Sequence, residues 1–125
     1  MSVEETQKVV HRYLEGHATD VLAQDAVFTM MGSGEVFEGP EAIAAMLQRF
    51  YHGIFEARAE ERSLVVTDGH AVLEADVVGR LREQLGDIAP SDEEVRVPLC
   101  VVYDVRDRSI EAARIYLETD RLRQR

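Results

Sequence analysis

Residues 70–81, HAVLEADVVGRL, decide the fold, because polar and apolar side chains alternate along them. Successive side chains of a β-strand point to opposite faces, so this period of two predicts a strand. One face carries Val72, Glu74, Asp76, Val78 and Arg80, and the other carries Leu73, Ala75, Val77 and Leu81. The preceding Asp68-Gly69 pair is typical of a tight turn, which predicts a hairpin with residues 55–67.

Further elements are predicted on both sides of this hairpin. Residues 95–105 and 110–119 are strand-like, and residues 26–31 form an earlier strand that returns through residues 36–38. Ser2, with Glu5 three residues later, indicates the start of a first helix, and Pro40 indicates the start of a second. Helices come first and antiparallel strands follow. This order predicts an α+β fold in which a curved antiparallel sheet wraps around the N-terminal helices.

The composition describes one domain over residues 1–125. Hydrophobic residues make up 46% of the chain and charged residues 30%, and the formal net charge is -10. This acidic balance repels phosphate backbones and anionic lipid, so we expect no nucleic acid and no membrane as a partner. The acidic N-terminus does not match a secretory signal, which predicts a cytoplasmic location.

Metal or cofactor chemistry is not indicated by the sequence. The four histidines, at positions 11, 17, 52 and 70, show no ligand spacing. Cys100 is the single cysteine and lies in an apolar run, which favours a small buried residue over a nucleophile and excludes an intrachain disulfide. We therefore expect no metal and no cofactor.

Four strings of residues carry a resemblance to a known family: residues 9–13 (VVHRY), 26–29 (AVFT), 34–43 (GEVFEGPEAI) and 110–117 (IEAARIYL). Their order and spacing resemble the SnoaL-like branch of the nuclear transport factor 2-like superfamily. The resemblance implies a cone, in which a strongly bent sheet closes on the N-terminal helices around a deep pocket. The superfamily contains polyketide cyclases, ketosteroid isomerases, epoxide hydrolases and members without catalysis, so the resemblance implies no single reaction.

Residue by residue, the resemblance argues against two of these activities. The helix tyrosine of the steroid isomerases matches Tyr13, but their base position falls on Met30 and their acid position on Cys100. Neither a thioether nor a thiol replaces a carboxylate in enolisation. The last-strand acid of the limonene-type epoxide hydrolases falls on Ile115.

The resemblance also turns the charged face of residues 72–80 toward the pocket. Glu74 and Asp76 would then lie ~7 Å apart inside the cone and serve as proton-transfer groups. Tyr13 would donate a hydrogen bond, and Arg80 would balance one of the carboxylates or orient an acidic substrate. The rest of the expected pocket wall is largely apolar and consists of Met30, Pro98, Cys100, Val102, Ala113, Ile115 and Leu117.

The alternation by itself favours the opposite assignment. In an ordinary half-buried strand the charged face meets solvent, and Leu73, Ala75 and Val77 form the core. The two assignments predict opposite faces for every residue of this strand.

Two classes of function stay open. The first is a SnoaL-like pocket protein that binds a small, largely apolar organic molecule and performs acid–base catalysis of the isomerase, cyclase, hydratase or hydrolase type. The alternative is a non-catalytic ligand-binding or dimerisation domain of the same fold.

A homodimer is expected from the other face of the late strands. Val97, Leu99, Val101 and Tyr103 form a row too apolar to be left in water. We therefore expect two copies to pack sheet to sheet, with polar contacts near the rim from Arg114, Tyr116 and Glu118.

Overall fold

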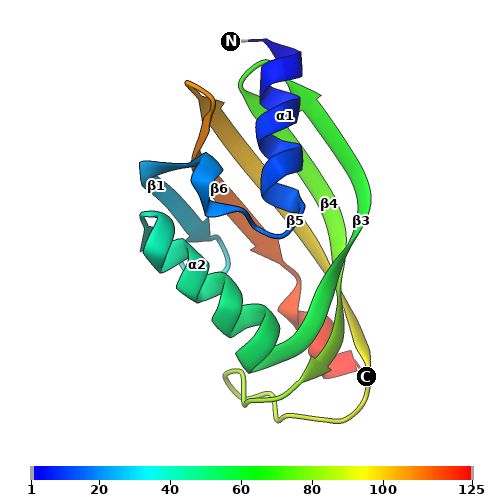
Figure 1. Ribbon diagram of the computed structural model, residues 1–125. Helices are drawn as coiled ribbons and strands as arrows, with labels where there is room; N and C mark the ends of the chain where they lie inside the picture. Colours follow the sequence, from blue (N-terminus) through cyan, green and yellow to red (C-terminus); the bar gives the residue numbers. More distant parts are fainter. Residues whose placement is uncertain (1, 125) are drawn as a thin grey trace.

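The computed structural model describes residues 2–124, with two α-helices packed on one curved sheet (Figure 1). Two short 3-10 helices, η1 (Thr19–Val21) and η3 (Thr119–Gln124), precede the first strand and follow the last strand. Helix α1 (Val3–Leu14) begins at Ser2, whose side-chain oxygen accepts a hydrogen bond from the Glu5 backbone N–H at 3.2 Å. Helix α2 (Pro40–Arg49) begins with proline, whose missing N–H costs nothing in a first turn. A π-helical turn, Phe50–Ile54, extends α2 to the sheet. Both predicted helix starts are confirmed.

The sheet contains β1 (Leu22–Met30), β2 (Glu35–Glu38), β3 (Phe55–Thr67), β4 (His70–Leu81), β5 (Val95–Arg106) and β6 (Ser109–Leu117). Their spatial order is β2-β1-β6-β5-β4-β3. All neighbours are antiparallel except β1 and β6, which are parallel. The α+β class is confirmed, whereas the purely antiparallel sheet is corrected to a mixed one. The early strand β1 joins the last strand along the chain, a pairing that no local pattern reveals.

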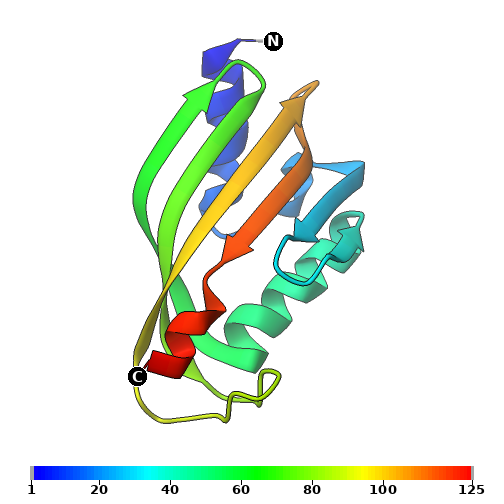
Figure 2. The same ribbon diagram turned by 180° about the vertical axis from the view of Figure 1, so that it is seen from behind.

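The two faces of the sheet have different surroundings. In Figure 1 both helices lie across the concave face, and in Figure 2, from behind, the strands lie in front of α1 and α2. The core therefore forms between the helices and the concave face, where Val10, Tyr13, Phe28 and Ile43 are at most 2% exposed. We call the other side the outer face. Among residues 2–124, no helix is long and apolar enough to span a bilayer.

Gly79 allows β3 and β4 to cross closely on the concave side. A Cβ atom at this position would lie 2.1 Å from the Glu56 carbonyl oxygen and 2.6 Å from the Ala57 Cα. Only glycine permits that approach between the two backbones. The crossing lies where β3 leaves the π-helical turn, so it shapes the end of the cone at which the sheet meets α2.

Candidate functional site

Strand β4 turns its charged side chains to the outer face and its apolar ones to the helices. Asp76 lies opposite Pro98 of β5, and Glu74 lies opposite Cys100. Leu73 and Ala75, which alternate with them, line a cavity on the concave face. The expectation that Glu74 and Asp76 point into the pocket is therefore wrong. The alternation alone gives the correct face, because the apolar set is the one that the helices bury.

Asp76 lies under two arginines although neither α1 nor α2 covers it. Its side chain is 5% exposed, and its Oδ2 atom accepts hydrogen bonds from Arg62 Nε at 2.6 Å and Arg96 Nη1 at 2.9 Å. Burial raises the pKa of Asp76, but the bonds from the two arginines outweigh it and hold the pKa below its ordinary value. Such a carboxylate stays ionised and paired, which suits a structural ion pair and not proton transfer to a ligand.

The remaining residues that we expected near this pair also lie on the outer face. Pro98 and Cys100 line an outer hollow of about 420 Å³ together with Glu74 and Asp76. Arg80 donates from Nε to the Asp92 carbonyl oxygen at 2.9 Å. Val102 pairs with Val72 of β4 and Arg114 of β6, which places all three on the outer face. The predicted place of Arg80, Pro98, Cys100 and Val102 on the pocket wall is therefore wrong, because they share the face of β4 and β5 that carries Glu74 and Asp76.

The apolar row of β5 lies on the concave face, contrary to the reasoning behind the expected dimer. Leu99, Val101 and Tyr103 line the concave cavity, and Val97 is fully buried. Their partner is thus the helical layer of the same chain. The outer face instead shows polar groups such as Arg114, which donates to both carboxylate oxygens of Asp104 at 2.8 and 3.1 Å.

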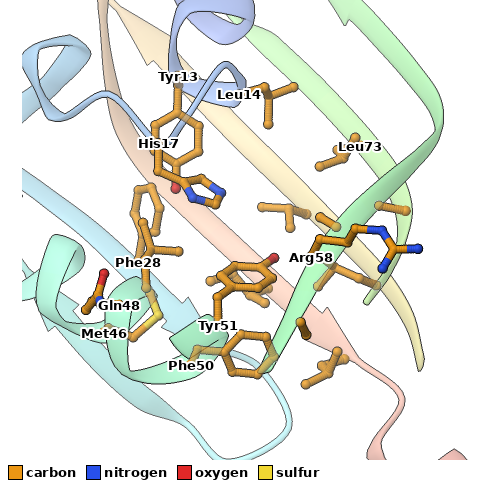
Figure 3. Close-up of a pocket in the computed structure, with 18 of the residues that line it drawn as sticks. Tyr13, Leu14, His17, Phe28, Met46, Gln48, Phe50, Tyr51, Arg58 and Leu73 are labelled. Atoms are coloured by element: carbon orange, nitrogen blue, oxygen red, sulfur yellow. The ribbon is translucent and has the colours of Figure 1, made fainter. Parts of the chain in front are cut away.

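A cavity of about 550 Å³ lies between the helices and the concave face (Figure 3). The structure places four of the predicted residues on its wall: Tyr13, Met30, Ile115 and Leu117. Ala113 faces the same side but is packed in the core beside Tyr103 and Phe28. The rest of the apolar wall comes from every layer of the cone and includes Leu14, Phe28, Ala44, Met46, Leu47, Phe50, Ala57, Ala59, Leu73, Ala75, Leu99 and Val101.

Three tyrosines bring hydroxyl groups to this apolar wall. Tyr13, Tyr51 and Tyr103 are 2%, 8% and 3% exposed. Within residues 2–124 none of the three hydroxyls forms a hydrogen bond, yet no fully enclosed side-chain oxygen or nitrogen lacks a partner. The hydroxyls are therefore open to the cavity itself. Burial raises the pKa of Tyr51 to about 12 and raises the pKa values of Tyr13 and Tyr103 further above their ordinary range, so all three are protonated donors near neutral pH.

His17 lies against two of these tyrosines. Its ring stacks on Tyr51 with centroids 5.4 Å apart and an interplanar angle of 21°, and lies 5.3 Å from the Tyr13 ring. Figure 3 shows Tyr13, His17, Phe28 and Tyr51 gathered around one space. Burial, with a smaller contribution from the charge of His52, lowers the pKa of His17. The imidazole is therefore neutral at pH 7, able to accept a proton.

Exposed polar groups surround the rest of the cavity. Gln48, His52, Arg58 and Glu61 all belong to its lining and are exposed. The Arg58 side chain is 64% exposed and bonds to Glu60 at 2.6 Å, and Figure 3 shows its guanidinium directed away from the cavity. These groups mark the solvent side of the site. No cluster of His, Cys, Asp and Glu among the described residues has the arrangement of a metal site.

In the sequence, His17 is one of four histidines without ligand spacing, and no role is predicted for it. In the structure α1 ends at Leu14, and His17 follows with a left-handed backbone, φ 57°. Tyr51 was not singled out, because its position depends on the π-helical turn. The only signal was the density of aromatic residues in Phe50-Tyr51-His52, which by itself does not distinguish a wall from a core.

Comparison with known proteins agrees with this architecture. The family model for the SnoaL-like domain matches residues 10–113. Among solved structures, a candidate polyketide cyclase from Silicibacter sp. has a TM-score of 0.82 at 17% identity, covering 100% of this chain and 98% of that one. A candidate SnoaL-like polyketide cyclase from Jannaschia sp. has a TM-score of 0.79 at 16% identity, with coverages of 97% and 90%.

A third similar structure is that of a protein with a different named activity. The epoxide hydrolase of the LEH-like type from M. tuberculosis has a TM-score of 0.69 at 17% identity, covering 98% of this chain and 89% of that one. No curated protein sequence is matched by this chain. At these identities the solved structures share the fold with this chain, and its own side chains must indicate what the cavity does.

Proposed function

The chain belongs to the SnoaL-like domain family, and from this premise we propose that its concave cavity binds a small, largely apolar organic molecule carrying an oxygen that accepts hydrogen bonds. The volume of about 550 Å³ lies in the range of small-molecule sites. Its wall is aliphatic and aromatic apart from a few polar groups. A ligand of this kind would bury its carbon skeleton against the wall and orient itself by one or two polar atoms.

The observation that carries the proposal is that no described residue accepts a hydrogen bond from the three tyrosine hydroxyls. Buried polar groups in folded proteins almost always have a partner, since an unpaired donor costs free energy. Tyr13, Tyr51 and Tyr103 are at least 92% buried as residues, and their hydroxyls open to an apolar cavity in which no described residue accepts from them. A carbonyl or similar oxygen of a bound molecule supplies the missing acceptor.

The charges around the cavity favour a neutral ligand. Among the described residues, Arg58 is the only arginine or lysine of the lining, and it is exposed and paired with Glu60. The formal net charge of -10 opposes the approach of anions. A carboxylate or phosphate would lose its hydration without gaining a buried counter-charge.

Isothermal titration with 2-tetralone, a small apolar ketone, and tetralin, the hydrocarbon of the same shape, tests this proposal. We expect the ketone to bind more tightly than the hydrocarbon. Tyr103→Phe should weaken ketone binding by about three- to tenfold, the value of one neutral hydrogen bond, and leave tetralin binding unchanged. The matched control is Tyr116→Phe on the outer face. Equal binding of the two compounds, or no binding of either, would contradict the proposal.

We also propose that two copies associate through the outer face. Val36 and Val65 are 48% and 56% exposed at its two edges, and the half-buried Val72 and Val102 lie between them. Neither α1 nor α2 covers this surface (Figure 2). Light scattering at micromolar concentration should give twice the chain mass of 14.1 kDa, and Val102→Arg should reduce it to the monomer. A single-chain mass for the unmodified protein would exclude this association.

A further inference from the structure

We propose that His17 is a catalytic base of the concave cavity and transfers a proton to and from a bound neutral carbonyl compound, at a carbon next to the carbonyl group. This inference rests on the proposed function, because it requires a ligand in the cavity. It assigns proton transfer to a residue at the end of α1 instead of to the strand carboxylates Glu74 and Asp76.

The backbone holds the imidazole in place by an unusual conformation. Gly16 and His17 follow α1 with φ values of 141° and 57°, so the chain turns sharply after its last helical residues. A left-handed conformation is uncommon for residues other than glycine, and such residues concentrate at functional sites. This turn returns the His17 ring to the ring of Tyr13, four residues earlier, and places it on the cavity wall.

The opposite side of the imidazole rests on a second irregular segment. Tyr51 belongs to the π-helical turn Phe50–Ile54, and π-helical turns are frequent at functional sites. The stacked His17 and Tyr51 rings therefore join two independent departures from regular backbone. The stack fixes the plane of the imidazole. Because stacking covers the face of the ring, the nitrogen atoms at its edge stay free to contact a ligand.

The groups around His17 favour a neutral base. Tyr13 of α1 and Tyr51 contact its ring, His52 acts on it through its charge, and Arg58 and Glu61 of β3 belong to the same lining. No carboxylate forms an ion pair with His17 among the described residues. Burial lowers the pKa of His17, and the charge of His52 lowers it further by a smaller amount. The unprotonated form of His17 therefore persists to a lower pH than that of an ordinary histidine.

The proposed step is balanced within the cavity. The neutral imidazole nitrogen takes a proton from the ligand carbon, and the electron pair of that C–H bond becomes the carbon–carbon π bond of an enolate. The carbonyl π electrons move to the oxygen, which accepts hydrogen bonds from the tyrosine hydroxyls. The imidazolium then returns the proton to the same carbon or, in a conjugated ligand, to another one. No oxidant, reductant or co-reactant is consumed.

Deuterium exchange tests the assignment. 2-Tetralone is incubated with the protein in D₂O, and loss of its C–H signals next to the carbonyl is followed by NMR. We expect the protein to accelerate exchange, and His17→Gln to slow the catalysed exchange by about 10² while 2-tetralone binding stays within about threefold. His11→Gln, at an exposed histidine of α1 outside the cavity lining, is the matched control and should retain the exchange.

The pH dependence separates a base from a structural residue. The catalysed rate should rise with pH and level off above a midpoint below about 6.5, the ordinary histidine value. Binding of 2-tetralone without accelerated exchange, or full exchange by His17→Gln, would overturn the inference and leave the proposed function intact. If 2-tetralone does not bind at all, the proposed function itself fails.

Discussion

The two faces of the sheet differ in whether their polar side chains have hydrogen-bond partners. On the outer face, Asp76 is bonded by Arg62 and Arg96, and Asp104 by Arg114. On the concave face, the hydroxyls of Tyr13, Tyr51 and Tyr103 have no partner among the described residues. A buried polar group with partners stabilises the fold, whereas a hydroxyl that opens into a cavity without an acceptor from the described residues indicates a place for a ligand. The paired charges of the outer face therefore stabilise the fold, and the ligand site is expected on the concave face.

Removal of the Asp76 carboxylate should have the largest effect on stability. Asp76→Ala leaves Arg62 and Arg96 adjacent without their shared anion, and we expect a loss of about 2 kcal/mol in the free energy of unfolding. This is below the usual cost of breaking a buried pair, because both arginines are at least half exposed. Urea unfolding measures it, with the exposed Glu74→Ala as control. An unchanged free energy of unfolding would show that the bonds of Asp76 to Arg62 and Arg96 do not stabilise the fold.

Filling the cavity should change binding and leave the fold intact. Ala75 is 3% exposed and lies on the cavity wall, so the larger side chain of Ala75→Leu projects into empty space. We expect 2-tetralone binding to weaken by more than about tenfold, with the free energy of unfolding within about 1 kcal/mol of the parent. Cys100→Leu, on the outer face, is the control and should bind normally. Equal binding by the two variants would place the ligand elsewhere.

Acid should weaken the outer face selectively. The bonds from Arg114 lower the pKa of Asp104, and those from Arg96 and Arg62 outweigh burial and lower that of Asp76. A lowered folded-state pKa contributes stability that is present above the unfolded value, about 4, and is lost as the pH falls through the folded value. The stability difference between the parent and Asp76→Ala should therefore shrink below about pH 4 in urea titrations. A constant difference down to pH 2 would contradict these pairings.

Removal of a tyrosine hydroxyl should have the smallest effect on stability. Tyr51→Phe deletes a hydroxyl whose hydrogen no described residue accepts. The free energy of unfolding, measured by thermal unfolding, should therefore stay within about 0.5 kcal/mol of the parent. A destabilisation above 1 kcal/mol would mean that the hydroxyl has a structural partner, and the comparison of the two faces would lose its basis.

The predictable part of this molecule follows from local signals. The Ser2–Glu5 cap, the proline start of α2 and the turn at Asp68-Gly69 each act within a few residues, and all three occur as predicted. The faces of β4 were also readable from its alternation. The family resemblance predicts the opposite faces, and the apolar set Leu73, Ala75 and Val77 indicates the correct ones.

The candidate site was less predictable because its geometry depends on tertiary packing. His17 reaches the cavity through a left-handed backbone after α1, and Tyr51 through a π-helical turn, neither of which has a period in the sequence. The parallel pairing of β1 with β6 joins residues far apart along the chain. Of the three stacked or adjacent rings of Tyr13, His17 and Tyr51, the family resemblance predicts a role for Tyr13 alone.

A crystal structure with 2-tetralone tests most directly the central claim that the concave cavity, and not the outer cluster of charges, is the ligand site. Our account predicts the ketone between the helices and the concave face. Its oxygen should lie within hydrogen-bond distance, about 2.5–3.0 Å, of the hydroxyl of Tyr13, Tyr51 or Tyr103. A ketone bound instead beside Glu74 and Arg96 on the outer face, with the concave cavity empty, would contradict it.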